Sequence, residues 1–178
     1  YIILELPHAM QPDKRYTVEI NPAMHADTSA ASITFNIFQC VSEAIHINLV
    51  GYPTDSRLKA ADLYYFMGDG GNRDYSDFEG HDVFIYNVNT GVYQTAGTVN
   101  FWMENKTETH WNLTGSDVWT ADVFGFTTPG TYRLAIEGVG CSEPFEIRED
   151  IYKDPFKVSV LGYFYMRIGQ DNLDMTPV

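Results

Sequence analysis

The sequence predicts an all-β fold in which two layers of antiparallel strands pack face to face. Apolar and polar residues alternate with a period of two along most of its 178 residues, which is the pattern of half-buried strands. Turn residues recur about every 8–12 positions, as in β-sandwiches. Aromatic residues make up 15% of the chain, and their side chains fit a pleated, half-buried surface.

Five strands are predicted in the first half of the chain, each bounded by turn residues. In "RYTVEI" (15–20), the apolar residues Tyr16, Val18 and Ile20 fall on one face. The same alternation defines the other four, at residues 1–6, 32–40, 43–50 and 58–66.

The second half adds predicted strands at residues 82–88, 93–102 and 117–123, and two more within "FTTPGTYRLAIEGVGCSEPFEI" (126–147). Pro129 and Gly130 set a turn, because proline fixes φ and glycine accepts conformations closed to other residues. Tyr132 follows that turn, which predicts a tyrosine corner in which its hydroxyl bonds to nearby backbone. The side chains expected in the core here are Tyr132, Leu134, Ile136, Phe145 and Ile147.

The segment "DPFKVSVLGYFYMRIG" (154–169) departs from this pattern and predicts a helix. Asp154 is an acceptable N-cap, Pro155 an acceptable first helical residue, and Gly169 can end the helix. Its apolar residues fall near helical spacing. A strand is the rival interpretation because β-branched and aromatic residues are dense here, but the helix is favoured.

Charge and cysteine content limit the function classes. The net charge of −13 repels phosphate backbones and anionic lipids, so we expect neither nucleic acid nor membrane as a partner. We expect the chain to be a processed or excised piece of a longer protein, because Tyr1 opens inside a predicted strand without a signal peptide. Cys40 and Cys141 are expected as separate thiols; the alternative is a disulfide, worth roughly 4–5 kcal/mol in the chain-entropy model.

Two groups of side chains are candidate binding sites. In the acidic, glycine-rich loop 68–82, Asp69, Asp74 and Asp77 offer oxygen ligands of the kind Ca²⁺ prefers, although a solvated turn is the favoured interpretation. Elsewhere, an aromatic platform for sugar rings is possible, but packing in the core or at an interface is favoured. The platform residues would be Trp102, Trp111 and Tyr93, whereas Trp119 is expected in the core.

Four segments occur in the order seen in one known family. They are "INLVGYPTDSRLKAA" (47–61), "IYNVNTGVYQTAG" (85–97), "VWTADVFGFTTPGTYRLAIEGVGCSEPFEI" (118–147) and "IYKDPFKVSVLGYFYMRIG" (151–169). Together they resemble the N-terminal immunoglobulin-like module of family 9 glycoside hydrolases, the cellulase and endoglucanase group. The most specific residues are Asn48, Val50, Gly51 and Tyr52, with the run from Trp119 to Ile147.

The resemblance implies an immunoglobulin-like sandwich at residues 43–150, followed at 151–178 by the linker and start of a catalytic (α/α)6 barrel. Residues 1–42 would be additional strands or the end of a preceding β-domain. The barrel of such enzymes needs an Asp pair and a distant Glu, and neither motif is in this sequence. We therefore expect no catalytic residue and no enzymatic activity in this chain, and no cofactor apart from the calcium considered above.

The implied function is a non-catalytic module that packs against and supports the catalytic barrel of the same parent chain. The packing residues would be Phe156, Val160, Leu161, Phe164 and Tyr165. A polysaccharide is a further partner, and the location would be secreted, periplasmic or at the cell surface. The alternatives are a carbohydrate-binding module or a cell-surface adhesion domain, because a fold alone does not give a function.

Overall fold

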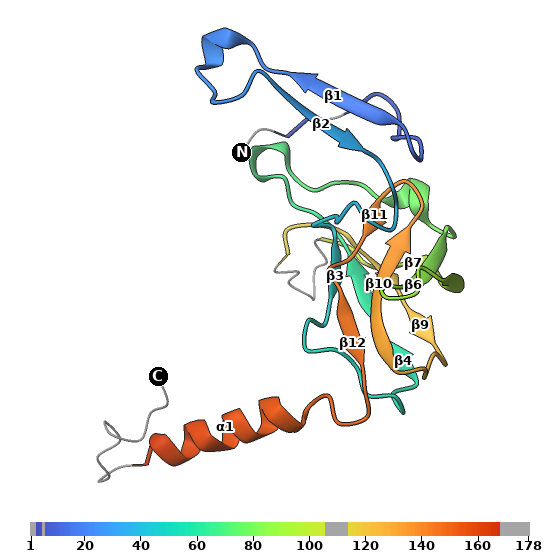
Figure 1. Ribbon diagram of the computed structural model, residues 1–178, viewed down its shortest axis with the longest axis vertical. Helices are drawn as coiled ribbons and strands as arrows, with labels where there is room; N and C mark the ends of the chain where they lie inside the picture. The colour runs from blue at the N-terminus through green and yellow to red at the C-terminus, as the bar shows by residue number, and fades with distance from the viewer. Residues whose placement is uncertain (1–2, 5, 106–113, 168–178) are drawn as a thin grey trace.

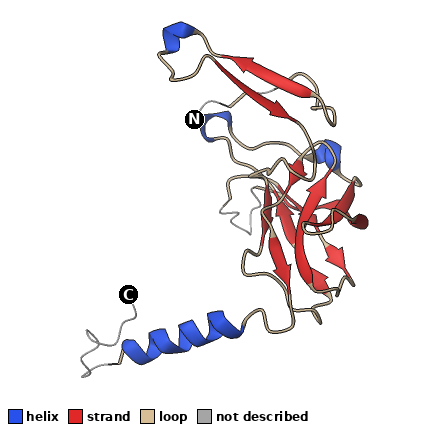
Figure 2. Ribbon diagram, in the orientation of Figure 1, coloured by secondary structure: helices blue, strands red, loops and turns tan. Residues whose placement is uncertain are grey.

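The computed structural model describes residues 3–4, 6–105 and 114–167 (Figure 1). These residues form twelve strands, three short 3-10 helices and one α-helix, α1 (Lys153–Tyr165), so the all-β prediction is confirmed (Figure 2). The strands are β1 (Arg15–Glu19), β2 (Ala30–Thr34), β3 (Ile45–Ile47), β4 (Leu58–Lys59), β5 (Ala61–Leu63), β6 (Asp82–Asn87), β7 (Tyr93–Met103), β8 (Val118–Ala121), β9 (Val123–Phe124), β10 (Gly130–Ile136), β11 (Gly140–Cys141) and β12 (Phe145–Ile147). The 3-10 helices are Pro22–Met24, Gly68–Gly70 and Ser76–Phe78.

Two antiparallel layers make the sandwich, and β7 belongs to both. Its first half, residues 93–98, pairs with β6, which continues through β10 to β11 and β12. Its second half pairs with β8, and that layer continues through β5 to β3. The two layers are therefore joined covalently along one strand.

The core lies between the layers and follows the predicted alternation. Along β10, Tyr132, Leu134 and Ile136 are all buried, as are Phe145 and Ile147 on β12. The Tyr132 hydroxyl donates to the carbonyl of Pro129 at 3.3 Å, so the predicted tyrosine corner is confirmed. Trp119 is 2% exposed and packs edge-on against Phe101, which confirms its expected place in the core.

The predicted strand 58–66 is wrong as one continuous strand. Residues 58–59 pair with β9, whereas residues 61–63 pair with β3 and β8. The chain changes partner at Ala60, whose carbonyl accepts a hydrogen bond from the Tyr52 hydroxyl. Alternation alone does not reveal such a change of partner.

The N-terminal region forms a separate hairpin of β1 and β2, which stands apart from the sandwich in Figure 1 and contains no buried residue. The strand predicted at 1–6 is wrong for its described residues 3, 4 and 6, which lie outside any strand. The strand predicted at 32–40 ends at Thr34. Beyond it Asn36 organises a turn, accepting from the amides of Phe38 and Cys40.

The predicted C-terminal helix is confirmed, but its start was wrong. The N-cap is Tyr152, and Asp154 lies within the first turn. The chain is already turning there, because the amide of Lys153 donates to the carbonyl of Asp150 at 2.9 Å. None of the described helices combines the length and apolar character needed to cross a bilayer.

Candidate domain junction

The start of α1 is tied to the sandwich by a turn at residues 48–51. The Asn48 carbonyl accepts from the amide of Gly51 at 2.9 Å, and its side-chain oxygen accepts from the amide of Val50 at 3.1 Å. Its side-chain nitrogen donates to the Gly51 carbonyl at 3.1 Å and to the Tyr152 hydroxyl at 3.0 Å. One asparagine therefore closes the turn and also holds the N-cap of α1.

Gly51 is the position in this turn where no side chain fits. Its φ is +103°, and a Cβ would lie 2.3 Å from the carbonyl oxygen of Glu146 and 3.1 Å from the side chain of Ile151. Both conditions favour glycine, because other residues rarely adopt this φ and backbone cannot yield as a flexible side chain can. The Tyr152 hydroxyl donates to the Gly51 carbonyl at 3.0 Å, which completes the contact with α1.

Tyr52 fastens the same turn to β12. Its amide donates to the Glu146 carbonyl at 2.9 Å, and its carbonyl accepts from the amide of Arg148 at 3.1 Å. Its ring packs edge-on against Phe145, and burial raises the pKa of its hydroxyl. The described groups of this junction are amides, carbonyls and hydroxyls, so the arrangement is suited to holding two parts of a chain together.

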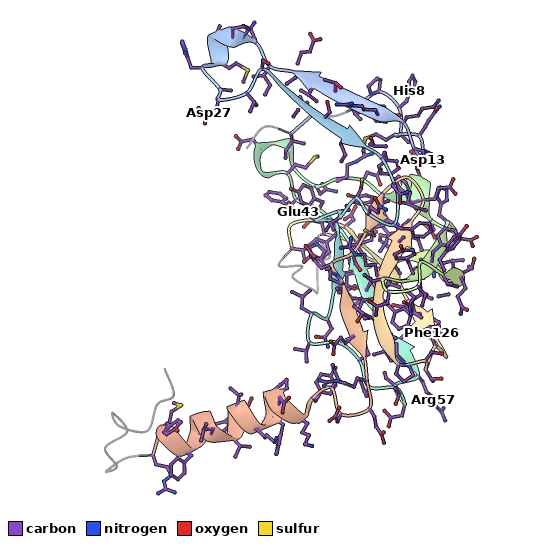
Figure 3. All side chains as sticks on the ribbon, viewed as in Figure 1. His8, Asp13, Asp27, Glu43, Arg57 and Phe126 are labelled. Carbon is purple, nitrogen blue, oxygen red and sulfur yellow. The ribbon has the colours of Figure 1, made fainter. Side chains whose placement is uncertain are left out.

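Beyond the junction, α1 exposes apolar side chains on more than one side (Figure 3). Of the five predicted packing residues, Phe156, Val160 and Leu161 are exposed, with Phe156 at 67%. Phe164 and Tyr165 are half-buried, and their rings pack against each other at 5.7 Å. The prediction missed three further exposed apolar side chains, those of Val158, Tyr163 and Met166.

A family model described as the cellulase N-terminal ig-like domain matches residues 41–141, more than half of the chain. The chain belongs to the cellulase N-terminal ig-like domain family. The match includes the turn at 48–51 and ends before α1, and the β1–β2 hairpin lies outside it.

Other members of this cellulase group show the same similarity. Endoglucanase D of Acetivibrio thermocellus is 41% identical over 58 residues, which are 33% of this chain and 9% of that protein. The crystal structure of a metagenome-derived glycoside hydrolase family 9 endoglucanase superposes with a TM-score of 0.50 at 24% identity. That superposition covers 67% of this chain and 20% of the other, and at this identity it shows the immunoglobulin-like fold. The matched part of this chain thus spans only a small part of the length of these relatives.

The predicted calcium ligands of this cellulase N-terminal ig-like domain do not form a ligand set. Asp69 and Asp77 lie in two separate 3-10 helices. The Asp74 carboxylate accepts from the amide of Ser76 at 2.8 Å, and this hydrogen bond lowers the pKa of Asp74. In the described part of the chain, no three His, Cys, Asp or Glu side chains are grouped to hold a metal ion. Calcium binding stays a prediction.

The predicted sugar-binding aromatics are also separated. Trp102 is 58% exposed and Tyr93 is also exposed, but they lie at opposite ends of β7, roughly 25–30 Å apart along the strand. Tyr93 instead packs against Phe38 and Phe84, at 4.6 and 5.7 Å between ring centroids. Trp111 lies outside the described residues.

A row of polar side chains crosses the layer that contains Trp102, and sequence reasoning missed it. His46 on β3 pairs with Asp62 on β5, Asp62 with Thr120 on β8, and Thr120 with Asn100 on β7. The neighbours of these residues along the strands, Ile45, Ala61, Leu63, Trp119, Ala121 and Val99, are buried in the core. Because successive side chains alternate between faces, this polar row (His46, Asp62, Thr120 and Asn100) lies on the outer face of the layer. Burial raises the pKa of Asp62.

Proposed function

We propose that this domain is a non-catalytic module that packs against and supports the catalytic domain of a family 9 glycoside hydrolase. The observation that carries the proposal is the exposed apolar surface of α1, held by the Asn48–Tyr152 junction. An isolated helix of 13 residues is marginal in water, and most helical stability in proteins comes from packing. A helix with exposed apolar side chains on several sides is therefore expected to be covered by further protein.

The same proposal extends to the organisation and location of the parent protein. Residues 43–150 are the sandwich, residues 151–178 lead into the catalytic (α/α)6 barrel, and residues 1–42 add strands outside the family module. The matched relatives are named as endoglucanases, which supports a polysaccharide as the substrate of the parent. An enzyme meets a polysaccharide of this kind outside the cytoplasm, so the proposed location is secreted, periplasmic or at the cell surface.

The surface of α1 can be tested in the whole 178-residue chain. Phe156→Glu combined with Val160→Glu places charge on two exposed apolar positions of α1, and Val92→Glu on the sandwich is the matched control because Val92 is also exposed. Light scattering is expected to show that the unsubstituted 178-residue chain associates as its concentration rises. The α1 variant should reduce this association, and the control should leave it unchanged. Circular dichroism verifies that each variant is folded. If the unsubstituted 178-residue chain is monomeric at all concentrations and binds no apolar dye, the proposal is contradicted.

The non-catalytic role has a separate test. Reducing-sugar assays of the chain on soluble β-glucans are expected to show no release above the rate of a heat-denatured sample. Hydrolysis by the purified chain would place catalytic residues inside the sandwich and refute this part of the proposal.

A further inference from the structure

We propose that the outer face of the β3–β5–β8–β7 layer binds an uncharged β-linked glucan chain, with Trp102 stacking on a sugar ring and the polar row hydrogen bonding to hydroxyls. The inference rests on the proposed function for its ligand class, since the parent is taken to act on such a polysaccharide. It assigns this module a direct contact with polysaccharide, in addition to support of a catalytic domain.

The shape of the face suits an extended polymer. The polar row crosses four neighbouring strands, one residue from each, in a continuous register. Three inter-strand spacings make its length about 14 Å. A line of half-exposed and exposed polar groups across a sheet can follow a linear chain, whereas a small sugar would be enclosed in a pocket.

Trp102 lies at one end of this row. It follows Asn100 by two positions on β7. The register between β7 and β8 shifts between Phe101 and Met103, and bulges of this kind re-aim a side chain. An indole ring that is 58% exposed beside polar groups offers an apolar surface to the C–H face of a pyranose.

The polar row keeps hydrogen-bonding capacity for a ligand. Asn100 donates its amide nitrogen to the Thr98 carbonyl at 2.9 Å, which leaves its side-chain oxygen as an acceptor. His46 uses Nε2 on the Tyr64 carbonyl at 3.1 Å and stacks on the Tyr64 ring, which leaves Nδ1. The Asp62 carboxylate accepts no hydrogen bond from residues 3–4, 6–105 or 114–167. Sugar hydroxyls can both donate and accept, so successive hydroxyls of a glucan can pair with each of these groups.

Charge selects among polysaccharides. The chain carries a net charge of −13, and Asp62 in the polar row lies close enough to Asp122 for the two carboxyls to repel each other. Acidic polysaccharides are repelled by such a surface, whereas neutral glucans are not.

Affinity electrophoresis of the 178-residue chain in native gels tests the proposal. The gels contain hydroxyethyl cellulose or cereal β-glucan as neutral β-linked probes, dextran as the α-linked control and polygalacturonate as the acidic control. The unsubstituted 178-residue chain is expected to be retarded by the two β-glucans and by neither control polymer. Trp102→Ala is expected to weaken retardation about tenfold, and Asn100→Ala to weaken it less. Phe124→Ala removes another exposed aromatic residue, on β9, and is expected to leave retardation unchanged.

Each other outcome overturns the inference. Absence of retardation by both β-glucans shows that the face binds no such polymer. Equal retardation of the Trp102→Ala variant, or equal retardation by dextran, shows that binding occurs elsewhere or is unspecific. Failure here is distinguishable from failure of the proposed function, because the α1 variant is measured by association in the absence of any sugar.

Discussion

The side-chain amide of Asn48 donates to the hydroxyl of Tyr152, which lies 104 residues further along the chain, at 3.0 Å. This contact joins the turn at residues 48–51 to the N-cap of α1. Its two partners come from two of the segments that carry the family resemblance, "INLVGY" and "IYKDPF", and the structure gives a physical reason for both. The turn holds the orientation in which α1 leaves the sandwich.

Replacing Tyr152 by phenylalanine should weaken this junction. The substitution removes the hydroxyl that bonds both Asn48 and Gly51, and we expect a loss of about 0.5–1.5 kcal/mol in the free energy of unfolding. Urea denaturation followed by circular dichroism measures it. Tyr163→Phe removes an exposed hydroxyl from the same helix and should change nothing. Equal stability of the two variants would mean that the junction is not held by these hydrogen bonds.

Gly51→Ala should be much more damaging than alanine at another positive-φ glycine. At Gly51 the new Cβ meets the Glu146 carbonyl at 2.3 Å, whereas nothing lies within 4 Å of the corresponding position at Gly125. Both substitutions incur conformational strain of about 1 kcal/mol, and only the first adds a clash with backbone, so we expect it to cost about 2 kcal/mol more. Thermal denaturation of both variants gives the comparison. A similar melting temperature for the two would refute this account of the turn.

The carboxyl of Asp122 should make stability depend on pH. Burial raises its pKa, and repulsion from Asp62 adds to the shift. The pKa of such a carboxyl is higher in the folded than in the unfolded state. Below the unfolded pKa, near 3.9, the group is protonated in both states and costs no stability. As pH rises through the folded pKa, its ionisation lowers the free energy of unfolding progressively. Asp122→Asn should therefore stabilise the protein at pH 7, by at most about 1 kcal/mol after solvent screening, and have little effect at pH 4.

Denaturation curves at pH 4 and pH 7 measure this difference. Asp74→Asn is the control of opposite sign, because the hydrogen bond from Ser76 lowers the pKa of Asp74. Its substitution should destabilise the protein at pH 7 and have a smaller effect at pH 4. If Asp122→Asn stabilises equally at both pH values, its effect does not arise from ionisation.

The two cysteines should differ in their rate of alkylation, although a hydrogen bond joins their backbones. The Cys141 amide donates to the Cys40 carbonyl at 2.9 Å, and the structure holds both as free thiols; separate thiols in the protein stay a prediction. Cys141 is fully buried, and burial raises the pKa of its thiol, whereas Cys40 is only half-buried. Alkylation of the native protein should label Cys40 more than about tenfold faster. Mass spectrometry after labelling in buffer and in denaturant checks this, and a chain that resists both would instead contain a disulfide.

Features that depend on nearby residues could be predicted from the sequence. Alternation along residues 130–136 gives β10 and its buried face, and Pro129–Gly130 gives the turn that makes Tyr132 a corner. The spacing of apolar residues after Tyr152 gives α1. Each of these is set by residues within a few positions of one another.

Features that depend on how strands pair could not be predicted. His46, Asp62 and Thr120 are far apart in sequence, and only the register of β3, β5 and β8 places them in one row. The turn organised by Asn36 ends β2 early although Phe35 and Ile37 continue the alternation. Packing of distant segments decides these features, and a periodic pattern assigns side chains to a face without saying which strands pair.

The course of β7 has a consequence for how the molecule comes apart. The first half of β7 pairs with β6 and its second half with β8, so the two layers use different hydrogen bonds of one strand and stay connected through its backbone. Because opening one layer displaces the strand that borders the other, amide hydrogens on β6 and on β8 should exchange with solvent at similar free energies. A pulling force applied to one layer is therefore carried to the other through the continuous backbone of β7.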